Sequence, residues 1–318
     1  MTDIAGGTPA AGGEHPGGAR LVSGPGEPPS RGATFADQVS SWQSLIEQAL
    51  AKRLPAADSE PTRLHAAMRD SVLHGGDRAR PLLLFCAARA VGLGEAQVEA
   101  AACAIELMHA YSRVHDHLPA MDDEDLRRGR PTCHQAYDEG TAVLVGDALQ
   151  SLAFQLLAGD EALPRLPRIR LRLIELLADA IGAGGKAGAQ SLEAAMQGRQ
   201  LPAADIEALY ARKTGALIRA SVLMAVACAP DTPSHLQAAL GEFASSAGVA
   251  FQIQDDLLDL SGGGKRAQGK LTYPAAVGPA EAQRRVEALY AHALEALRPF
   301  GPAADALRSL TGWLLMRN

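Results

Sequence analysis

Hydrophobic residues recur every three or four positions along most of this chain, as they do on the buried face of a helix. The spacing is first clear at Trp42, Leu45, Ile46 and Leu50. Breaks that contain glycine or proline separate this stretch from similar ones further on, and such residues mark helix ends. The pattern predicts a first helix from Phe35 and further helices over residues 62–74, 79–91, 95–118, 141–157, 165–183, 203–229, 233–259, 279–298 and 302–316.

The composition favours an all-helical fold. Hydrophobic residues make up 47% of the 318 residues but aromatic residues only 4%, so alanine and leucine must fill most of the interior. Both are strong helix formers, whereas runs of β-branched residues, which favour strands, are almost missing. We predict an all-α fold, a single large helical bundle over residues 36–318. Residues 1–35 are rich in glycine and proline without helical spacing, which is typical of a disordered tail.

Charge and cysteine content narrow the possible partners and the compartment. The formal net charge is −6, so no surplus of lysine and arginine is available for general nucleic-acid binding. Cys86, Cys103, Cys133 and Cys228 are far apart in the sequence and form no metal-ligand pair, which is typical of free thiols in a reducing compartment. Neither a signal peptide nor a run of about 20 apolar residues is recognisable. We therefore expect a cytoplasmic protein without a membrane span.

An acidic cluster lies near the end of the predicted helix 233–259. Asp255 and Asp259 are four residues apart and share one helix face, with Asp256 beside them. The helix dipole is unfavourable for carboxylates at this end, and no basic residue lies three or four positions away. Oxygen ligands of this kind suit Mg²⁺, which typically bridges carboxylates and substrate phosphates. The alternative is a solvated acidic helix end.

A second acidic cluster occurs earlier in the chain, after a long apolar helix. Asp116 and Asp122 are six residues apart, which places them about 120° apart on an ideal helix. Pro119 lies between them and disturbs helical geometry, so the chain can bring Asp122 back toward Asp116. Arg127 and Arg128 follow closely. Taken alone, this stretch could also be a salt-bridged loop.

Further motifs lie before, between and after the two acidic clusters. Together with the clusters, and in the same order along the chain, they resemble the motifs of trans-isoprenyl diphosphate synthases (the polyprenyl synthetase family), in particular bacterial farnesyl diphosphate synthases. The similarity runs from about residue 40 to the C-terminus. The first acidic motif of that subgroup reads Asp-Asp-Leu-Pro-Ala-Met-Asp, and this chain has Asp116-His-Leu-Pro-Ala-Met-Asp122. The other matching motifs are His109-Ala-Tyr-Ser, Leu126-Arg-Arg-Gly, Pro131-Thr-Cys-His, Gly146-Asp-Ala-Leu-Gln, Lys213-Thr-Gly-Ala-Leu-Ile-Arg, Phe251-Gln-Ile-Gln-Asp-Asp, Lys270-Leu-Thr-Tyr-Pro and Met316-Arg-Asn.

The resemblance implies a fold of the isoprenoid synthase type and a Mg²⁺-dependent prenyltransferase. It implies that several Mg²⁺ ions bind an allylic prenyl diphosphate and help to release an allylic cation, which isopentenyl diphosphate then attacks. The metal ligands carried over are Asp116, Asp122, Asp255, Asp256 and Asp259. The catalytic residues carried over are Asp116, Asp122, Lys213, Thr214, Gln252 and Asp255.

The same resemblance assigns substrate-binding roles. Arg127, Lys213, Thr214 and Gln252 match positions around the allylic diphosphate, and Lys270 matches a phosphate-facing lysine. Arg80, His109 and Arg128 match positions that bind isopentenyl diphosphate. Tyr111, five residues before Asp116, is expected to limit product length to C15, although it can equally be an ordinary core aromatic residue.

The chain departs from the family pattern at several positions. In the motif that binds isopentenyl diphosphate, the lysine is replaced by Asp77. A like-charge contact at about 5 Å with an effective dielectric constant near 20 costs roughly 3 kcal/mol, unless Arg78 swings in to compensate. His117 replaces the middle aspartate of the first motif, and imidazole is a poor Mg²⁺ ligand. The Gly-Gly-Gln motif and the aspartate after it become Gly-Ala-Gln190 and Glu193, and the loop after Asp259 is short.

Three functions therefore remain open. The first is condensation of an allylic diphosphate with isopentenyl diphosphate, to give farnesyl diphosphate, with activity reduced or altered by Asp77. The second is a terpene cyclase or hydrolase that ionises the allylic diphosphate without isopentenyl diphosphate. The third is a non-catalytic subunit of a prenyl synthase dimer. The family commonly forms dimers, so we expect a homodimer.

Overall fold

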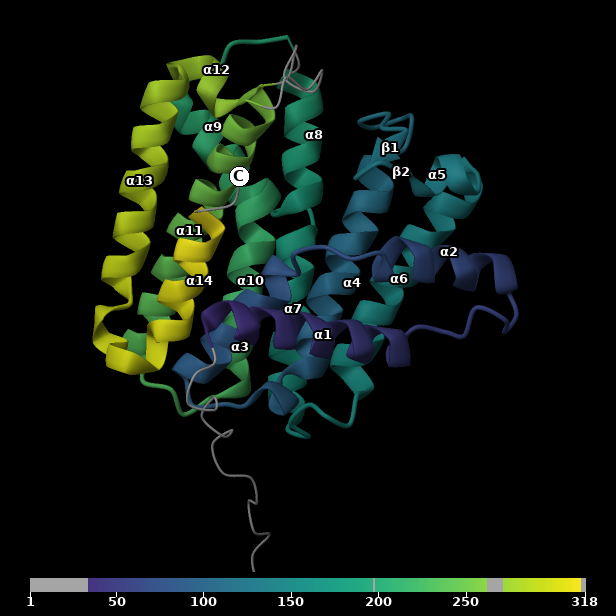
Figure 1. Ribbon diagram of the computed structural model, residues 1–318, viewed down its shortest axis with the longest axis horizontal. Coiled ribbons are helices and arrows are strands. Elements are labelled where there is room, and N and C mark those ends of the chain that lie inside the picture. The colour runs from purple at the N-terminus through teal and green to yellow at the C-terminus, as the bar shows by residue number, and fades with distance from the viewer. Residues whose placement is uncertain (1–33, 197, 262–270, 316–318) are drawn as a thin grey trace, which may run out of the picture.

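The computed structural model describes residues 34–196, 198–261 and 271–315, and these are mostly helical (Figure 1). The all-α prediction is confirmed. The first half of the chain contains α1 (Phe35–Arg53), α2 (Thr62–Leu73), α3 (Ala79–Ala90), η1 (Glu95–Gln97), α4 (Glu99–Asp116), β1 (Leu126–Arg127), β2 (Arg130–Pro131), α5 (Cys133–Ala136) and α6 (Glu139–Gly159). The second half contains α7 (Pro167–Ile181), α8 (Lys186–Met196), α9 (Ala203–Tyr210), η2 (Ala211–Gly215), α10 (Ala216–Cys228), α11 (Ser234–Ser261), α12 (Tyr273–Val277), α13 (Pro279–Ala296), η4 (Arg298–Ala304) and α14 (Asp305–Leu315).

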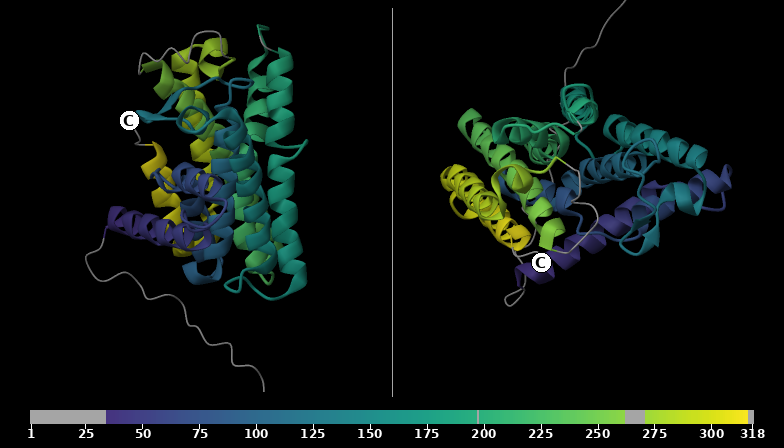
Figure 2. Two further views of the ribbon diagram at one scale, coloured as in Figure 1. Left: turned by 90° about the vertical axis from the view of Figure 1, so that its right-hand side faces the viewer. Right: turned by 90° about the horizontal axis from the view of Figure 1, so that it is seen from above.

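The centre of the bundle is formed by helices that are apolar on nearly every side. In α3 the run from Leu82 to Ala88 is buried throughout, and α3 packs against α4, α10 and α14. Burial on all sides removes the need for a polar face, and this explains the weak amphipathic pattern of α3. Helix α10 in turn packs against α7 and α11. The views of Figure 2 show the long helices running roughly side by side around this centre.

The outer helices show the spacing expected of surface helices. Helix α1 buries Trp42, Ile46 and Leu50 and crosses the long helices in the foreground of Figure 1. It begins at a capping box, because the Thr34 side chain accepts a hydrogen bond from the Asp37 N–H while the Asp37 carboxylate accepts one from the Thr34 N–H. Two features of the sequence therefore mark the first helix: the spacing of its apolar residues and the capping residues at its N-terminus.

Several predicted boundaries are wrong in ways that matter for the site. The predicted helix 95–118 ends at Asp116, and the predicted helix 203–229 contains the single π-helical turn η2. A short hairpin, β1–β2, occurs where no strand was expected. Helix α8 is not among the predicted helices: glycines at 182, 184, 185 and 188 weaken the helical pattern there, and only Ala189 of this helix is buried. The short α12 was also missed.

Helix α6 leaves two large apolar side chains uncovered by the rest of the fold. By length and mean hydropathy, 1.4 over its most apolar window, it is the one helix of the described residues that could cross a membrane, and 33% of that window is buried. The core helix of a protein outside membranes passes the same test, so this finding is weak evidence for a span. Val143 and Leu144 are exposed on α6.

Three sequence expectations fall on residues outside the described ranges. These are the disordered tail up to residue 33, the loop of residues 262–270 with Lys270, and the terminal Met316-Arg-Asn. The proposed division into a tail and one domain remains a prediction.

Candidate active site

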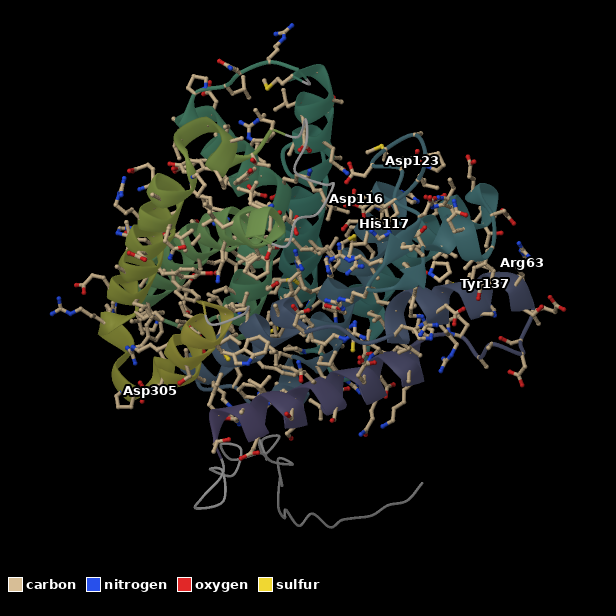
Figure 3. The ribbon with its side chains drawn as sticks, turned by 45° about the horizontal axis from the view of Figure 1, so that its top comes forward. Arg63, Asp116, His117, Asp123, Tyr137 and Asp305 are labelled. Carbon is tan, nitrogen blue, oxygen red and sulfur yellow. The ribbon has the colours of Figure 1, made fainter. Side chains whose placement is uncertain are left out.

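The first acidic cluster lies where α4 ends and the chain turns back. The Asp122 N–H donates a hydrogen bond to the Asp116 carbonyl oxygen (2.9 Å), and the Met121 N–H donates one to the Leu118 carbonyl oxygen (2.8 Å). The chain therefore folds back at Pro119 and brings Asp122 to Asp116, as the sequence predicted. In Figure 3, Asp116 and His117 lie together at the upper end of the bundle.

Helix α8 contributes two side chains to Asp116 that the sequence reasoning missed. Lys186 Nζ lies 2.7 Å from Asp116 Oδ2, and the Gln190 side-chain amide donates to Asp116 Oδ1. Burial lowers the pKa of Lys186, and Asp116 opposes this shift. Lys186 and Gln190 are four residues apart and so share one helix face. The four-residue spacing is a sequence signal for this pair, but it carries meaning only once Lys186–Met196 is assigned to a helix.

The second acidic cluster occupies the last turns of α11. Desolvation raises the pKa of Asp255 to about 7; Arg80 and Arg127 oppose this shift, whereas Asp256 and Asp259 increase it. Burial also raises the pKa of Asp256, to about 6. Carboxylates crowded in this way repel one another unless a cation lies between them, and their oxygen-only chemistry fits Mg²⁺. Asp256 accepts hydrogen bonds from Tyr210 and Gln252, so it is also tied to the protein.

The π-helical turn η2 carries Lys213 and Thr214 into the space between the clusters. Lys213 Nζ pairs with the Glu193 carboxylate, and Glu193 raises the pKa of Lys213 against the effect of burial, with help from Asp122 and Asp116. The Thr214 hydroxyl donates to Gln252 Oε1 of α11 (2.6 Å). Single π-helical turns within helices occur frequently at functional sites because they re-aim side chains.

The hairpin β1–β2 positions the two adjacent arginines. Arg128 and Gly129 form its two-residue turn, with φ of 51° and 75°, which are the positive values of a type I′ turn. A positive φ at a non-glycine residue costs on the order of 1 kcal/mol or more and persists where other contacts compensate. One such contact is the ion pair between Arg128 and Asp77, at 3.1 Å.

A cavity of about 410 Å³ opens beside the acidic clusters. Its walls come from the turn before α3, from α4, from the hairpin and from the ends of η2 and α11. Arg80 Nη1 lies 3.3 Å from His109 Nε2 on one wall. Burial, and then the charge of Arg80, lower the pKa of His109 well below its ordinary value, so this imidazole is neutral. Six arginines line the cavity: Arg78, Arg80, Arg113, Arg127, Arg128 and Arg130.

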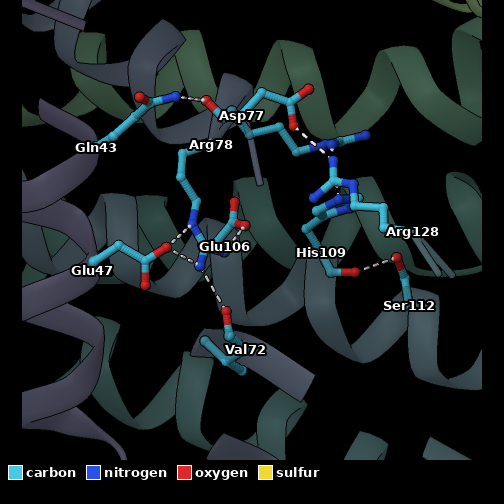
Figure 4. Close-up of polar contacts among 10 residues, drawn as sticks. Gln43, Glu47, Val72, Asp77, Arg78, Glu106, His109, Ser112 and Arg128 are labelled. Carbon is cyan, nitrogen blue, oxygen red and sulfur yellow. Dashed lines mark hydrogen bonds and ion pairs between the residues drawn. The ribbon is translucent and has the colours of Figure 1, made fainter. Parts of the chain in front are cut away.

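The surroundings of Asp77 differ from the sequence expectation. Its carboxylate is paired with Arg128, so its charge is partly neutralised within the cavity wall (Figure 4). The rescue by Arg78 does not occur, because that side chain is 3% exposed and donates to Glu47, Glu106 and the Val72 carbonyl oxygen. Arg78 holds the helices together and is not available to a ligand.

His117 turns toward the basic cavity. It is buried, and its Nε2 lies 3.5 Å from a Glu124 carboxylate oxygen. Burial, followed by the charge of Arg113, lowers the pKa of His117 to about 4. The imidazole of His117 is therefore neutral and lies beside Glu124 where α4 ends.

Tyr111 is half-buried on the α6 side of α4. Its ring packs edge-on against His115, with 5.0 Å between ring centres, and its hydroxyl hydrogen-bonds Gln150. Gly146 of α6 makes room for His115, because an added Cβ would lie 2.0 Å from the imidazole Nε2. Tyr111 is therefore a packed residue one to two turns before Asp116, which is compatible with either of its expected roles.

This fold and site define a class of protein: an all-helical enzyme whose paired carboxylate clusters and basic cavity suit diphosphate substrates. The sequence profile of the family "Polyprenyl synthetase" matches residues 61–296. The chain belongs to the polyprenyl synthetase family, whose members are prenyltransferases of isoprenoid biosynthesis and use Mg²⁺.

Similar proteins agree with this assignment over nearly the whole chain. The farnesyl diphosphate synthase of Escherichia coli is 37% identical over 297 residues, covering 89% of this chain and 99% of that protein. The farnesyl diphosphate synthase of Haemophilus influenzae is 36% identical with the same coverage. Among solved structures, an FPP/GFPP synthase from Zymomonas mobilis superposes with a TM-score of 0.81 at 34% identity, over 88% of this chain and 98% of that one. These findings do not support the expectation of reduced activity.

Proposed function

We propose that this protein condenses an allylic prenyl diphosphate with isopentenyl diphosphate, and that farnesyl diphosphate is its product. The observation that supports this most strongly is the basic cavity beside the acidic clusters. Asp255 lines the same cavity as His109 and Arg128, and Lys213 is close enough to Asp116 for their charges to interact. A diphosphate held by the carboxylates through Mg²⁺ can therefore lie beside a diphosphate held by the arginines.

In this proposal Asp116, Asp122, Asp255 and Asp259 would hold Mg²⁺, while Asp256 supports them through its hydrogen bonds. Mg²⁺ held there would supply positive charge to the leaving diphosphate. Within the chain, Lys213, Lys186 and Arg127 attract the same group. Their charge favours breaking the C–O bond, because the electron pair leaves with the diphosphate.

The remaining steps take place between this group and the basic cavity. Gln252 is oriented by the Thr214 hydroxyl, so that its dipole stabilises the allylic cation. Arg80, His109 and Arg128 bind isopentenyl diphosphate with its double bond toward C1 of that cation. A carbon–carbon bond then forms, and loss of a proton restores a double bond. Tyr111 limits the space for the growing chain, which supports a C15 product.

The test supplies geranyl or dimethylallyl diphosphate with Mg²⁺, in the presence and absence of isopentenyl diphosphate. Formation of a longer diphosphate only when both substrates are present is the expected result. The second candidate is ionisation without isopentenyl diphosphate, which Asp77 favours because an anion stands at a cation position. Consumption of the allylic substrate alone would support it. No turnover at all would favour a non-catalytic subunit.

We also propose a homodimer in the cytoplasm. Val143 and Leu144 of α6 are 41% and 58% exposed, and burying them against a second copy would remove apolar surface from water. The free cysteines support a reducing compartment.

A further inference from the structure

The basic cavity holds several arginines, but other side chains already engage some of them. Arg78 is bound to Glu47 and Glu106, and Arg128 is paired with Asp77. These acidic partners cancel part of the positive charge that a diphosphate requires. The binding of isopentenyl diphosphate must therefore depend on the cations that remain.

Arg113 is the most notable of these remaining cations. It lies on α4, four residues after His109 and four before His117, so these three side chains share the face that lines the cavity. Within the described residues, its guanidinium makes no hydrogen bond or ion pair. Burial lowers the pKa of Arg113 to about 10, and the charges of Arg127 and Arg128 add to this effect.

Arg80 provides a second, independent sign that this cavity is built for an anion. Its Nε is buried and has no hydrogen-bond partner among the residues that the structure describes. A buried donor without a partner costs free energy unless a ligand or water satisfies it. The neighbouring His109 is neutral and so adds no charge to the cavity.

Together these contacts explain how the cavity can tolerate Asp77. Arginines that outnumber the carboxylates around them repel one another, and a multiply charged anion between them reduces that repulsion. Arg113 reaches the cavity from α4, on a different element from Asp77, so the Asp77–Arg128 pair does not consume its charge. Arg113 thus supplies a positive charge in place of the one that the family's lysine would supply at position 77.

We propose that Arg113 binds the diphosphate of isopentenyl diphosphate and replaces the cation lost at Asp77. This inference rests on the proposed function for the identity of the ligand. Arg113 is then a specificity-determining residue for the homoallylic substrate, and it has no part in binding the allylic diphosphate at the carboxylate clusters.

The first experiment compares Arg113→Gln with Arg172→Gln, which removes an exposed arginine of α7 paired with Glu175. Isothermal titration with isopentenyl diphosphate, and separately with inorganic pyrophosphate, measures anion binding without turnover. We expect about 10- to 100-fold weaker binding by Arg113→Gln, an increased KM for isopentenyl diphosphate, and an unchanged KM for the allylic substrate. Binding as tight as in the Arg172→Gln control overturns the proposal.

A rescue distinguishes a lost charge from a disturbed fold. Asp77→Lys in the Arg113→Gln background replaces an anion with a cation and releases Arg128 from its ion pair, so it should restore binding to within about fivefold of the unaltered protein. If the double variant binds as weakly as the single one while melting at the temperature of the unaltered protein, charge at Arg113 is not the cause.

The unaltered protein provides a test that does not depend on any variant folding. In a crystal structure with inorganic pyrophosphate, we expect the Arg113 guanidinium at hydrogen-bonding distance from a phosphate oxygen. A pyrophosphate bound in the cavity with Arg113 turned away contradicts the inference. Because these binding tests need no elongation, they decide the role of Arg113 even if the turnover test fails and the proposed function is wrong.

Discussion

At the scale of single residues, the pKa of Asp256 shows the cost of burying a carboxylate in this site. It is 9% exposed and accepts hydrogen bonds from Tyr210 and Gln252. Burial nevertheless raises its pKa to about 6, and Asp259 adds to the shift. The folded protein therefore favours the protonated form more than the unfolded chain does. Its contribution to stability is complete below about pH 4 and is lost as the pH rises through about 6.

Asp256→Asn should remove this pH dependence, because an amide carries no charge at any pH. In metal-free buffer at pH 8, we expect the variant to be more stable than the unaltered protein by on the order of 2 kcal/mol. At pH 5, between the unfolded and folded pKa values, the difference should be about half as large. Thermal unfolding at both pH values measures it, with the exposed Asp231→Asn as the control. An equal difference at both pH values would show that titration of Asp256 does not contribute.

At the scale of elements, the site depends on how closely η2 approaches α11. A Cβ added at Gly248 would lie 2.8 Å from the Cα of Gly215, so two glycines allow the helices to touch. This contact occurs one turn before Gln252, whose Oε1 accepts the Thr214 hydroxyl hydrogen bond at 2.6 Å. The orientation of the Thr214 side chain thus depends on the packing of η2 against α11 at the neighbouring Gly215.

Gly248→Ala should push η2 and α11 apart. We expect a loss of about 1–3 kcal/mol of unfolding free energy, together with a decrease in kcat because the Thr214–Gln252 hydrogen bond is strained. Urea unfolding and steady-state kinetics measure the two effects. Gly312→Ala in α14 is the matched control, because no atom lies within 4 Å of an added Cβ there. If both variants behave alike, the close approach is not required.

At the scale of the whole molecule, the uncovered surface of α6 suggests how the protein assembles. The helix is apolar enough to pass a test for membrane spans, yet it packs against α4 and α7 within the bundle. Its exposed positions also include Asp147, Ser151 and Gln155, so the uncovered large apolar side chains are confined to Val143 and Leu144. In the proposed homodimer, Val143 and Leu144 would contact the same surface of a second copy.

Leu144→Glu should prevent this association, because a carboxylate would be buried in an apolar contact. We expect self-association weakened by about 30-fold or more, measured by sedimentation or by size-exclusion chromatography with light scattering. Ala291→Glu, at an exposed position of α13 on the other side of the bundle, should leave the dimer intact. A dimer that survives Leu144→Glu unchanged would place the interface elsewhere.

The sequence predicted the helical bundle well because the apolar spacing in its long helices is local information. It also predicted that Asp122 returns to Asp116, since proline acts on its immediate neighbours. The sequence did not predict α8, because several glycines weaken the helical pattern there. The contact between Lys186 of this helix and Asp116 was therefore not predicted either. The sequence failed for Arg113 as well: four-residue spacing from His109 placed it on the same face, but only the packed structure showed that this face lines a cavity.

The sequence by itself determined the helical class, the family resemblance and the identity of the charged groups, because these depend on short-range patterns. Only the tertiary structure decided which charged side chains form ion pairs with one another. It paired Asp77 with Arg128 and sequestered Arg78 between Glu47 and Glu106. Electrostatic interaction depends on distance and burial, and both arise only when segments far apart in the chain pack together.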